Sequence, residues 1–406
     1  MKDYNSIRTI CEENSRISRK VIDEFLIYYT AGRNNLEQIM NRRFAVYKHV
    51  THELKTEWVN MLKAQYLAHE IFKKDGIIKK LLNHAELERL TREERIFLEQ
   101  HAKHPWRFSF SVIIKNPVSD FYLMEDVFSY EQFTLFSPGT TDLIKKQSPI
   151  LWFNLIGYNG ACWQSYGPIG AYNSFEPDDI YFFATELMSE IEDENEIMED
   201  LESNPVPYMM LLSGANYPLT FHKKDQMVLV MSEFDQEKIN TKELRSSFKT
   251  EYTDGVYRFT HKEWGEHPHF STVFFDERKK VILLQAMTDR GYHALVTAIN
   301  KYGFTFPYDP LIRVNTSMLV TAKNILKKEI VLNEYDALFH KEPSEKTQRT
   351  LDKINAFITL VIPDINAGRK PDIEKIAKKT GVDIKTAHDL VRKVLEKKDD
   401  MDKYVK

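Results

Sequence analysis

The first hundred residues repeat apolar side chains three and four positions apart. That spacing puts them on one side of an α-helix and leaves the charged residues between them in solvent. Ala31-Gly32 and Gly76 interrupt the pattern, whereas residues 34–74 contain neither Pro nor Gly. The segment therefore predicts one long helix or two nearly continuous ones. Thr91 and Glu94 have the spacing of a capping box, which predicts that a further helix begins there.

From Trp106 onward the period of the apolar pattern changes to two. Phe108, Phe110, Val112 and Ile114 alternate with polar or smaller residues. This alternation predicts a β-strand with one buried face.

Asn159-Gly160 separates two apolar runs, Leu151–Tyr158 and Ala161–Tyr166. An Asn-Gly pair in this position predicts a β-hairpin closed by a type I′ turn, which requires a positive φ at both residues.

The rest of the central region alternates short apolar runs with turn residues and a few helical patterns. Pro177 suits the first position of a helix, with two aspartates in its first turn. Further helices are predicted at 241–248, 288–302 and 317–328. Further strands are predicted at 121–128, 132–136, 208–212, 227–231, 256–260, 271–276 and 281–286.

These patterns predict an α+β protein in three parts. Residues 1–104 form a helical region, residues 105–340 an α+β region, and residues 341–406 a small helical module. Hairpin-type connections predominate in the centre, which favours an antiparallel sheet.

Composition narrows the class of protein. The chain has 406 residues, 42% of them apolar, and a net charge of −4. With only two cysteines, it has neither a disulfide framework nor a Cys-based zinc site. The amino terminus lacks the apolar core of a secretory signal, and no apolar run approaches the roughly 20 residues of a membrane-spanning helix. We therefore expect a soluble, cytoplasmic protein.

The segment DIEKIAKKTGVDIKTAHDLVRKVLEKK, residues 372–398, predicts two amphipathic helices joined by a turn at Gly381. Ala377 lies four residues before that glycine. Val382, Ala387 and Leu390 follow it at one, six and nine residues. In these offsets the segment resembles a helix-turn-helix module.

The resemblance implies that the second helix contacts a partner. Its contact residues would be Lys385, Thr386, His388, Arg392 and Lys393. Between residues 369 and 398 there are ten basic and five acidic residues, and basic side chains on phosphate add salt-dependent affinity for DNA. The alternative is a three-helix module that docks on protein or on its own chain. Asp383 and Asp389 favour that alternative because they would repel phosphate.

The segment HKEWGEHPH contains a second group of candidate ligands. His261, Glu263, His267 and His269 offer imidazole and carboxylate groups of the kind that bind zinc or another divalent ion. Their spacing matches no helical ligand pair, and Gly265 and Pro268 predict a loop. A surface loop is therefore the competing interpretation.

Two other features have structural interpretations. The glycines of GYNGACWQSYGPIG lie in and after a hairpin, so they predict turns and close packing and not a phosphate-binding loop. Cys162 stands beside Trp163 in a predicted strand, which indicates a buried thiol.

No catalytic or cofactor-binding motif stands out along the chain. The sequence therefore favours a non-catalytic binding or regulatory protein whose carboxy-terminal module contacts protein or DNA. The alternative is an enzyme with its site in the central region, which could depend on a metal at His261–His269. Neither prediction names a substrate, a cofactor or an oligomeric state.

Overall fold

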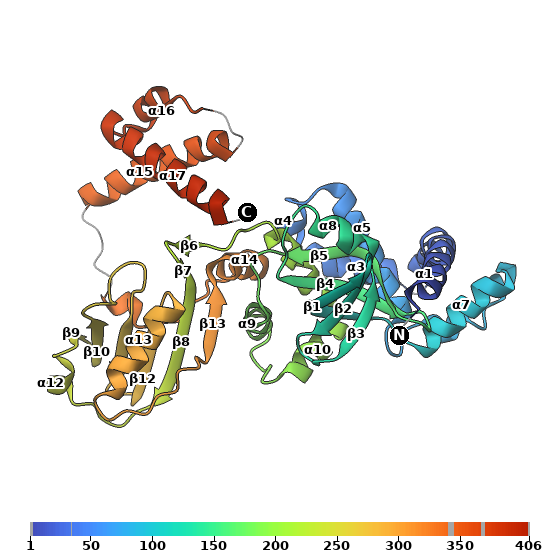
Figure 1. Ribbon diagram of the computed structural model, residues 1–406, viewed down its shortest axis with the longest axis horizontal. Coiled ribbons are helices and arrows are strands. Elements are labelled where there is room, and N and C mark those ends of the chain that lie inside the picture. Colours follow the sequence, from blue (N-terminus) through green and yellow to red (C-terminus); the bar gives the residue numbers. More distant parts are fainter. Residues whose placement is uncertain (1–2, 34, 340–344, 367–369, 405–406) are drawn as a thin grey trace. The chain divides into compact units, whose positions relative to one another are not determined.

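The computed structural model describes residues 3–33, 35–339, 345–366 and 370–404 (Figure 1). It divides into two compact units, Met1–Asn333 and Glu334–Lys406. Helices occur at both ends of the chain and antiparallel sheets in the middle, so the predicted α+β class is confirmed.

The amino-terminal region is helical, as the three-to-four spacing predicts. Its elements are α1 (Tyr4–Ser18), the π-helix η1 (Arg19–Leu26), α2 (Ile27–Arg33), α3 (Leu36–Val46), α4 (Lys48–Thr51), α5 (Thr56–Phe72), α6 (Ile78–Leu81), the 3-10 helix η2 (Ala85–Arg89) and α7 (Arg92–Lys103).

Two predictions about these helices have different outcomes. The capping box is present: the hydroxyl of Thr91 accepts a hydrogen bond from Glu94 N, and the Glu94 carboxylate accepts one from Thr91 N. The segment 34–74, expected to form one long helix or two nearly continuous ones, instead contains three helices, α3, α4 and α5. Tyr47 departs from helical geometry and residues 52–55 form a turn, although no Pro or Gly marks either break. Asn34 itself lies outside the described residues.

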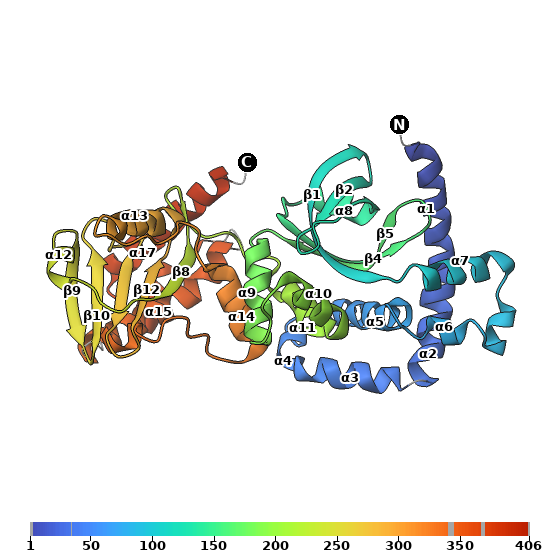
Figure 2. The same cartoon turned by 90° about the horizontal axis from the view of Figure 1, so that it is seen from below.

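Five strands close into a barrel with the order β1-β2-β3-β5-β4. They are β1 (Arg107–Val118), β2 (Phe121–Asp126), β3 (Gln132–Phe136), β4 (Leu151–Tyr158) and β5 (Trp163–Tyr172), with α8 (Pro138–Ile144) between β3 and β4. All neighbours are antiparallel except β3 and β5, which are parallel. Figure 2 shows α1 running beside β5.

The prediction of a single buried face is wrong for β1. Phe108 and Phe110 are buried, but so are Ser109 and Ser111 on the opposite face. Both faces are covered because one lies inside the barrel and the other packs against helices, where the Phe108 ring lies 4.8 Å from that of His69 on α5. Ile114, expected to be buried, is exposed where the strand extends beyond the core.

The Asn-Gly hairpin is confirmed, but its turn is not type I′. β4 and β5 pair antiparallel with Tyr158 opposite Trp163, so four residues form the connection. Gly160 has a φ of 91°, whereas Asn159 is not among the residues with positive φ. The Asn159 side chain instead accepts hydrogen bonds from the backbone nitrogens of Ala161 and Cys162, which stabilises a wider turn.

A helical segment follows the barrel. It contains α9 (Pro177–Leu187), α10 (Glu194–Ser203), α11 (Pro205–Met210) and the 3-10 helix η3 (Leu211–Gly214). The helix predicted from Pro177 is present, whereas the strand predicted at 208–212 is wrong. Pro205 occupies the first turn of α11, and the apolar residues after it are buried on all sides. A short run without amphipathic spacing does not distinguish a buried helix from a buried strand.

A second sheet has the order β13-β8-β12-β11-β10-β9, all antiparallel. Its strands are β8 (Val228–Asp235), β9 (Phe248–Thr253), β10 (Val256–His261), β11 (Thr272–Asp276), β12 (Val281–Ala286) and β13 (Ile312–Asn315). A small hairpin, β6 (Phe221–His222) and β7 (Asp225–Gln226), precedes it, and α12 (Thr241–Leu244) lies between β8 and β9.

One face of this sheet packs against α13 (Asp289–Asn300), whose buried side chains join the apolar core of the strands (Figure 1). The predicted hairpin of 271–276 with 281–286 is confirmed as β11 and β12. β9 and β13 were not predicted. The helix expected at 241–248 is confined to Thr241–Leu244, since Phe248 begins β9.

α14 (Thr316–Leu326) follows β13, and the 3-10 helix η4 (Asp336–Phe339) comes before the carboxy-terminal helices. Those helices are α15 (Glu345–Asn366), α16 (Ile373–Thr380) and α17 (Ile384–Tyr404). The two helices predicted within 372–398 correspond to α16 and α17.

Candidate functional site

The turn between α16 and α17 is set by the two ends of α16. At the start, the Asp372 carboxylate accepts a hydrogen bond from Lys375 N at 3.1 Å. At the end, Gly381 has a φ of 72°, and its N–H donates to Ala377 O at 2.8 Å. A left-handed residue ends a helix sharply, and glycine adopts that conformation without a steric penalty.

α17 begins directly after this turn because Asp383 caps it. The Asp383 carboxylate accepts hydrogen bonds from Thr386 N at 3.0 Å and from the Thr386 hydroxyl at 3.2 Å. These hydrogen bonds, led by the one from the backbone, hold the pKa of Asp383 below its usual range. Asp383 is therefore ionised at neutral pH and interacts with the positive end of its own helix.

Small residues lie where the helices of this unit meet. Ala377 on α16 and Ala387 on α17 are completely buried. Phe357 and Val361 of α15 share their apolar cluster. α15 thus covers the apolar sides of α16 and α17.

The opposite side of α17 carries the predicted contact residues, and all of them are exposed: Lys385, Thr386, His388, Arg392 and Lys393. With 3.6 residues per turn, Lys385, His388 and Arg392 follow one another along a single stripe of the helix. One acidic side chain lies on this stripe, since Arg392 Nη2 is 2.9 Å from Asp389 Oδ1. We call these five exposed residues the α17 face.

The four candidate metal ligands do not form a metal-binding group. His261 Nδ1 accepts hydrogen bonds from the backbone nitrogens of Glu263 and Trp264, both at 3.1 Å, and so caps its own turn. His267 packs its ring edge-on against His222 at 4.3 Å. His269 Nδ1 lies 2.7 Å from Thr288 Oγ1. Within the described ranges, no three His, Cys, Asp or Glu side chains form a group that could hold a metal ion.

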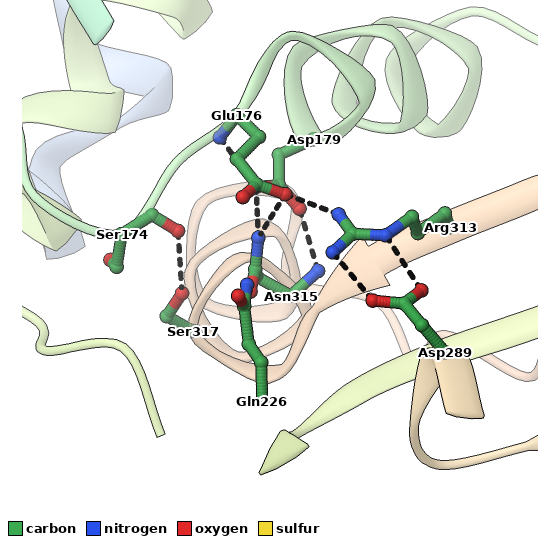
Figure 3. Close-up of polar contacts among 8 residues, drawn as sticks. All are labelled: Ser174, Glu176, Asp179, Gln226, Asp289, Arg313, Asn315 and Ser317. Carbon is green, nitrogen blue, oxygen red and sulfur yellow. Dashed lines mark hydrogen bonds and ion pairs between the residues drawn. The ribbon is translucent and has the colours of Figure 1, made fainter. Parts of the chain in front are cut away.

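A polar junction that the sequence did not single out connects α9, α13 and β13 (Figure 3). Arg313 of β13 donates from Nε and Nη2 to the two carboxylate oxygens of Asp289 at 2.9 and 3.0 Å. Its Nη1 donates to Glu176, the residue that precedes α9. One guanidinium therefore bridges carboxylates from two helix starts.

The side chain of Asn315 extends the same junction to Gln226 and Asp179. Gln226 Nε2 donates to Asn315 Oδ1 at 2.7 Å, and Asn315 Nδ2 donates to Asp179 Oδ2 at 2.8 Å. Asp179 is fully buried, and burial raises the pKa of its carboxyl to about 6. Because these polar groups already have partners within the chain, the junction fixes the start of α14 against α9.

A cavity of about 590 Å³ lies among η1, α5 and β5, with Asp23, Gln65 and Tyr166 in its wall. Gln65 Nε2 donates to the carbonyl oxygens of Tyr166 and Pro168, both at 2.9 Å, so this amide is occupied in joining α5 to β5. The cavity has the size of a small-molecule site. No local sequence pattern predicts it, because its wall is assembled from distant segments.

Comparison with family models, with curated proteins and with solved structures finds no match to this chain. In the part of the chain that the structure describes, none of the helices combines the length and the apolar character needed to cross a membrane.

Proposed function

We propose that this chain is a non-catalytic binding or regulatory protein that contacts duplex DNA through the α17 face. One observation carries the proposal: the basic and polar residues of α17 lie on its exposed side, whereas Ala387 and Val391 on the other side are buried. The helix therefore keeps its fold while its polar side is exposed.

Duplex DNA suits this face on electrostatic grounds. Lys385, Arg392 and Lys393 are three cations on one helix, and Arg392 would exchange its surface pair with Asp389 for a phosphate. Each cation on a phosphate releases condensed counterions. Asp383 repels phosphate less than its position in the sequence suggests, because its carboxylate is hydrogen-bonded at the helix start. The short turn and the buried alanines also support the resemblance to helix-turn-helix modules, whose second helix enters the major groove.

The test is a fluorescence-anisotropy titration of the full chain against a labelled random-sequence duplex at two salt concentrations. We expect a dissociation constant in the micromolar range at about 50 mM salt. Affinity should fall with a log–log slope of about −3 as salt rises, from about 0.9 per phosphate neutralised by each of the three cations.

The matched control lies in the same unit. The variant Lys385→Glu/Lys393→Glu and the variant Lys378→Glu/Lys379→Glu each reverse two exposed lysines, the first pair on α17 and the second on α16. The α17 variant should abolish binding, and the α16 variant should weaken it only modestly. No binding by the folded wild type at low salt would remove DNA as the partner and favour contact with protein. Equal losses in the two variants would mean that the α17 face does not make the contact.

A further inference from the structure

The two cysteines of the chain meet in the interior, although 151 positions separate them. Cys11 lies in the middle of α1 and Cys162 at the end of the β4–β5 turn. Their sulfur atoms are 3.3 Å apart. Both side chains are buried, and the phenyl rings of Phe121 and Phe136 belong to the same cluster. The sequence predicts the burial of Cys162 but gives no sign of its partner.

The surroundings of the two sulfur atoms are unequal. Asn159 Nδ2 donates a hydrogen bond to Cys11 Sγ at 3.2 Å. The thiol of Cys162 is placed to donate a second one, and hydrogen bonding by Cys162 is the main cause that lowers the pKa of Cys11. The same contact, together with burial, raises the pKa of Cys162. Cys11 is therefore the sulfur that more readily becomes a thiolate.

Neighbouring polar groups fix this geometry. Asn159 Oδ1 accepts from the backbone nitrogen of Cys162 at 2.9 Å, so one side chain holds both cysteines. Gln164 Nε2 donates to Cys11 O at 2.9 Å, which anchors α1 to β5. The two sulfur atoms need to move only roughly 1.2 Å closer together to reach the bond length of a disulfide.

We propose that Cys11 and Cys162 are an oxidation site that hydrogen peroxide converts to a disulfide between α1 and the barrel. The Cys11 thiolate attacks one oxygen of the peroxide, the O–O bond breaks, and the other oxygen leaves as water after protonation. Cys11 is then a sulfenic acid. The Cys162 sulfur attacks the Cys11 sulfur, the S–O bond breaks, and a second water leaves. In total, two thiols and one peroxide give one disulfide and two waters.

Peroxide is the oxidant class that the burial of the pair favours, because it is close to water in size. A bulky disulfide reagent would have to displace α1 before it reached either sulfur. Disulfides in reducing compartments are mostly transient and redox-sensing, which is the role that this site would have.

The experiment exposes the full chain to increasing hydrogen peroxide, quenches it, unfolds it and alkylates the remaining thiols. We expect a disulfide-linked pair of peptides containing Cys11 and Cys162 within one chain, a mass loss of two hydrogens, and reversal by a dithiol reductant. Met61, which is 46% exposed, serves as an internal competitor for peroxide. Sulfoxide at Met61 while both cysteines still alkylate fully would overturn the proposal.

Two variants test the order of the steps. In Cys162→Ser the sulfenic acid cannot be resolved, so a 1,3-diketone reagent that is present while the peroxide-treated chain is unfolded should label Cys11. In Cys11→Ser the same reagent should leave Cys162 unlabelled. Equal labelling of the two variants, or disulfides that form only between chains, would contradict the assigned roles. The wild-type result does not depend on either variant folding.

Discussion

Asp179 and Asn315 are joined by two hydrogen bonds, although they lie 136 positions apart in the chain. Asn315 donates to the carboxylate from its backbone nitrogen at 2.7 Å and from its side-chain Nδ2 at 2.8 Å. Asp179 lies in the first turn of α9, and Asn315 is the residue that precedes α14. A single buried carboxylate therefore holds the starts of two helices together.

We expect Asp179→Asn to destabilise the protein more at acidic pH than at neutral pH. Burial raises the pKa of Asp179 from 3.8 to about 6. Between these two pH values the carboxyl is therefore protonated in the folded state but ionised in the unfolded state. The stability contributed by Asp179 is greatest below the unfolded pKa and declines as pH rises toward 6. At about 1.4 kcal/mol per pKa unit, the cost of the substitution should be about 2 kcal/mol larger at pH 4.5 than at pH 7.

Denaturant unfolding at the two pH values measures this difference. Asp178→Asn is the matched control, because Asp178 lies in the same first turn of α9 and its side chain is exposed. Partial burial also raises the pKa of Asp178, but less than that of Asp179, so the same change of pH should alter the penalty for this substitution by a smaller amount. A penalty for Asp179→Asn that is unchanged or smaller at pH 4.5 would show that the Asp179 carboxyl is already ionised there.

Arg313→Lys should cost about 2 kcal/mol of unfolding free energy. A lysine ammonium cannot reproduce the two parallel hydrogen bonds to Asp289 while also reaching Glu176, and charge-assisted bonds contribute about 1.5 to 3 kcal/mol each. Arg258→Lys on β10 is the control. Its side chain is similarly exposed, but its ion pair with Glu251 joins two neighbouring strands of one hairpin and not two helix starts. The control should cost less than about 1 kcal/mol. Equal costs would mean that the bridge between two helices adds nothing.

Local rules predicted much of the fold. The Thr91–Glu94 capping box and the β11–β12 hairpin depend on residues close in sequence, and both are present. The segment at 208–212 fails for the opposite reason, since burial on all sides removes the amphipathic spacing that separates helix from strand. β13 is only four residues long, and its pairing with β8 is a contact between distant segments.

The candidate sites also differ in whether their residues are close together in sequence. The α17 face could be listed from sequence because its residues share one helix, and helical geometry places them together. The junction around Asn315 and the pair of Cys11 with Cys162 bring together residues more than a hundred positions apart. Nothing in the local pattern marks those partners, since only the tertiary fold places them in contact.

Gly157→Ala should destabilise the barrel by about 1 to 3 kcal/mol, the usual cost of overpacking. A Cβ at this position would lie 2.4 Å from Trp106 Nε1. The indole cannot yield, because it stacks on Tyr166 with ring centres 3.8 Å apart and its Nε1 donates to His101. Thermal unfolding followed by circular dichroism measures the loss. Gly139→Ala is the control: its Cβ would meet only the terminal Cδ1 of Ile169, which can rotate away. A near-neutral Gly157→Ala would show that Trp106 is mobile.

Gly381→Ala should weaken the pairing of α16 with α17 without unfolding the rest of the chain. Gly381 has a φ of 72°, and a residue with a Cβ pays about 1 to 2 kcal/mol in that conformation. An added Cβ would meet only the Lys353 side chain at 3.5 Å, an ordinary contact, so the cost comes from the backbone conformation. Hydrogen exchange of the full chain should show amides of α16 and α17 exchanging roughly tenfold faster, since about 1.4 kcal/mol corresponds to a factor of ten.

Gly303→Ala provides the matched control, because Gly303 has a φ of 87° after α13 and nothing lies within 4 Å of an added Cβ. It should accelerate exchange near α13 and leave α16 and α17 unchanged. If Gly381→Ala also reduces duplex DNA binding while Gly303→Ala does not, the angle between α16 and α17 matters for the contact as well as for stability. If Gly381→Ala leaves exchange in both helices unchanged, the left-handed turn does not limit their stability.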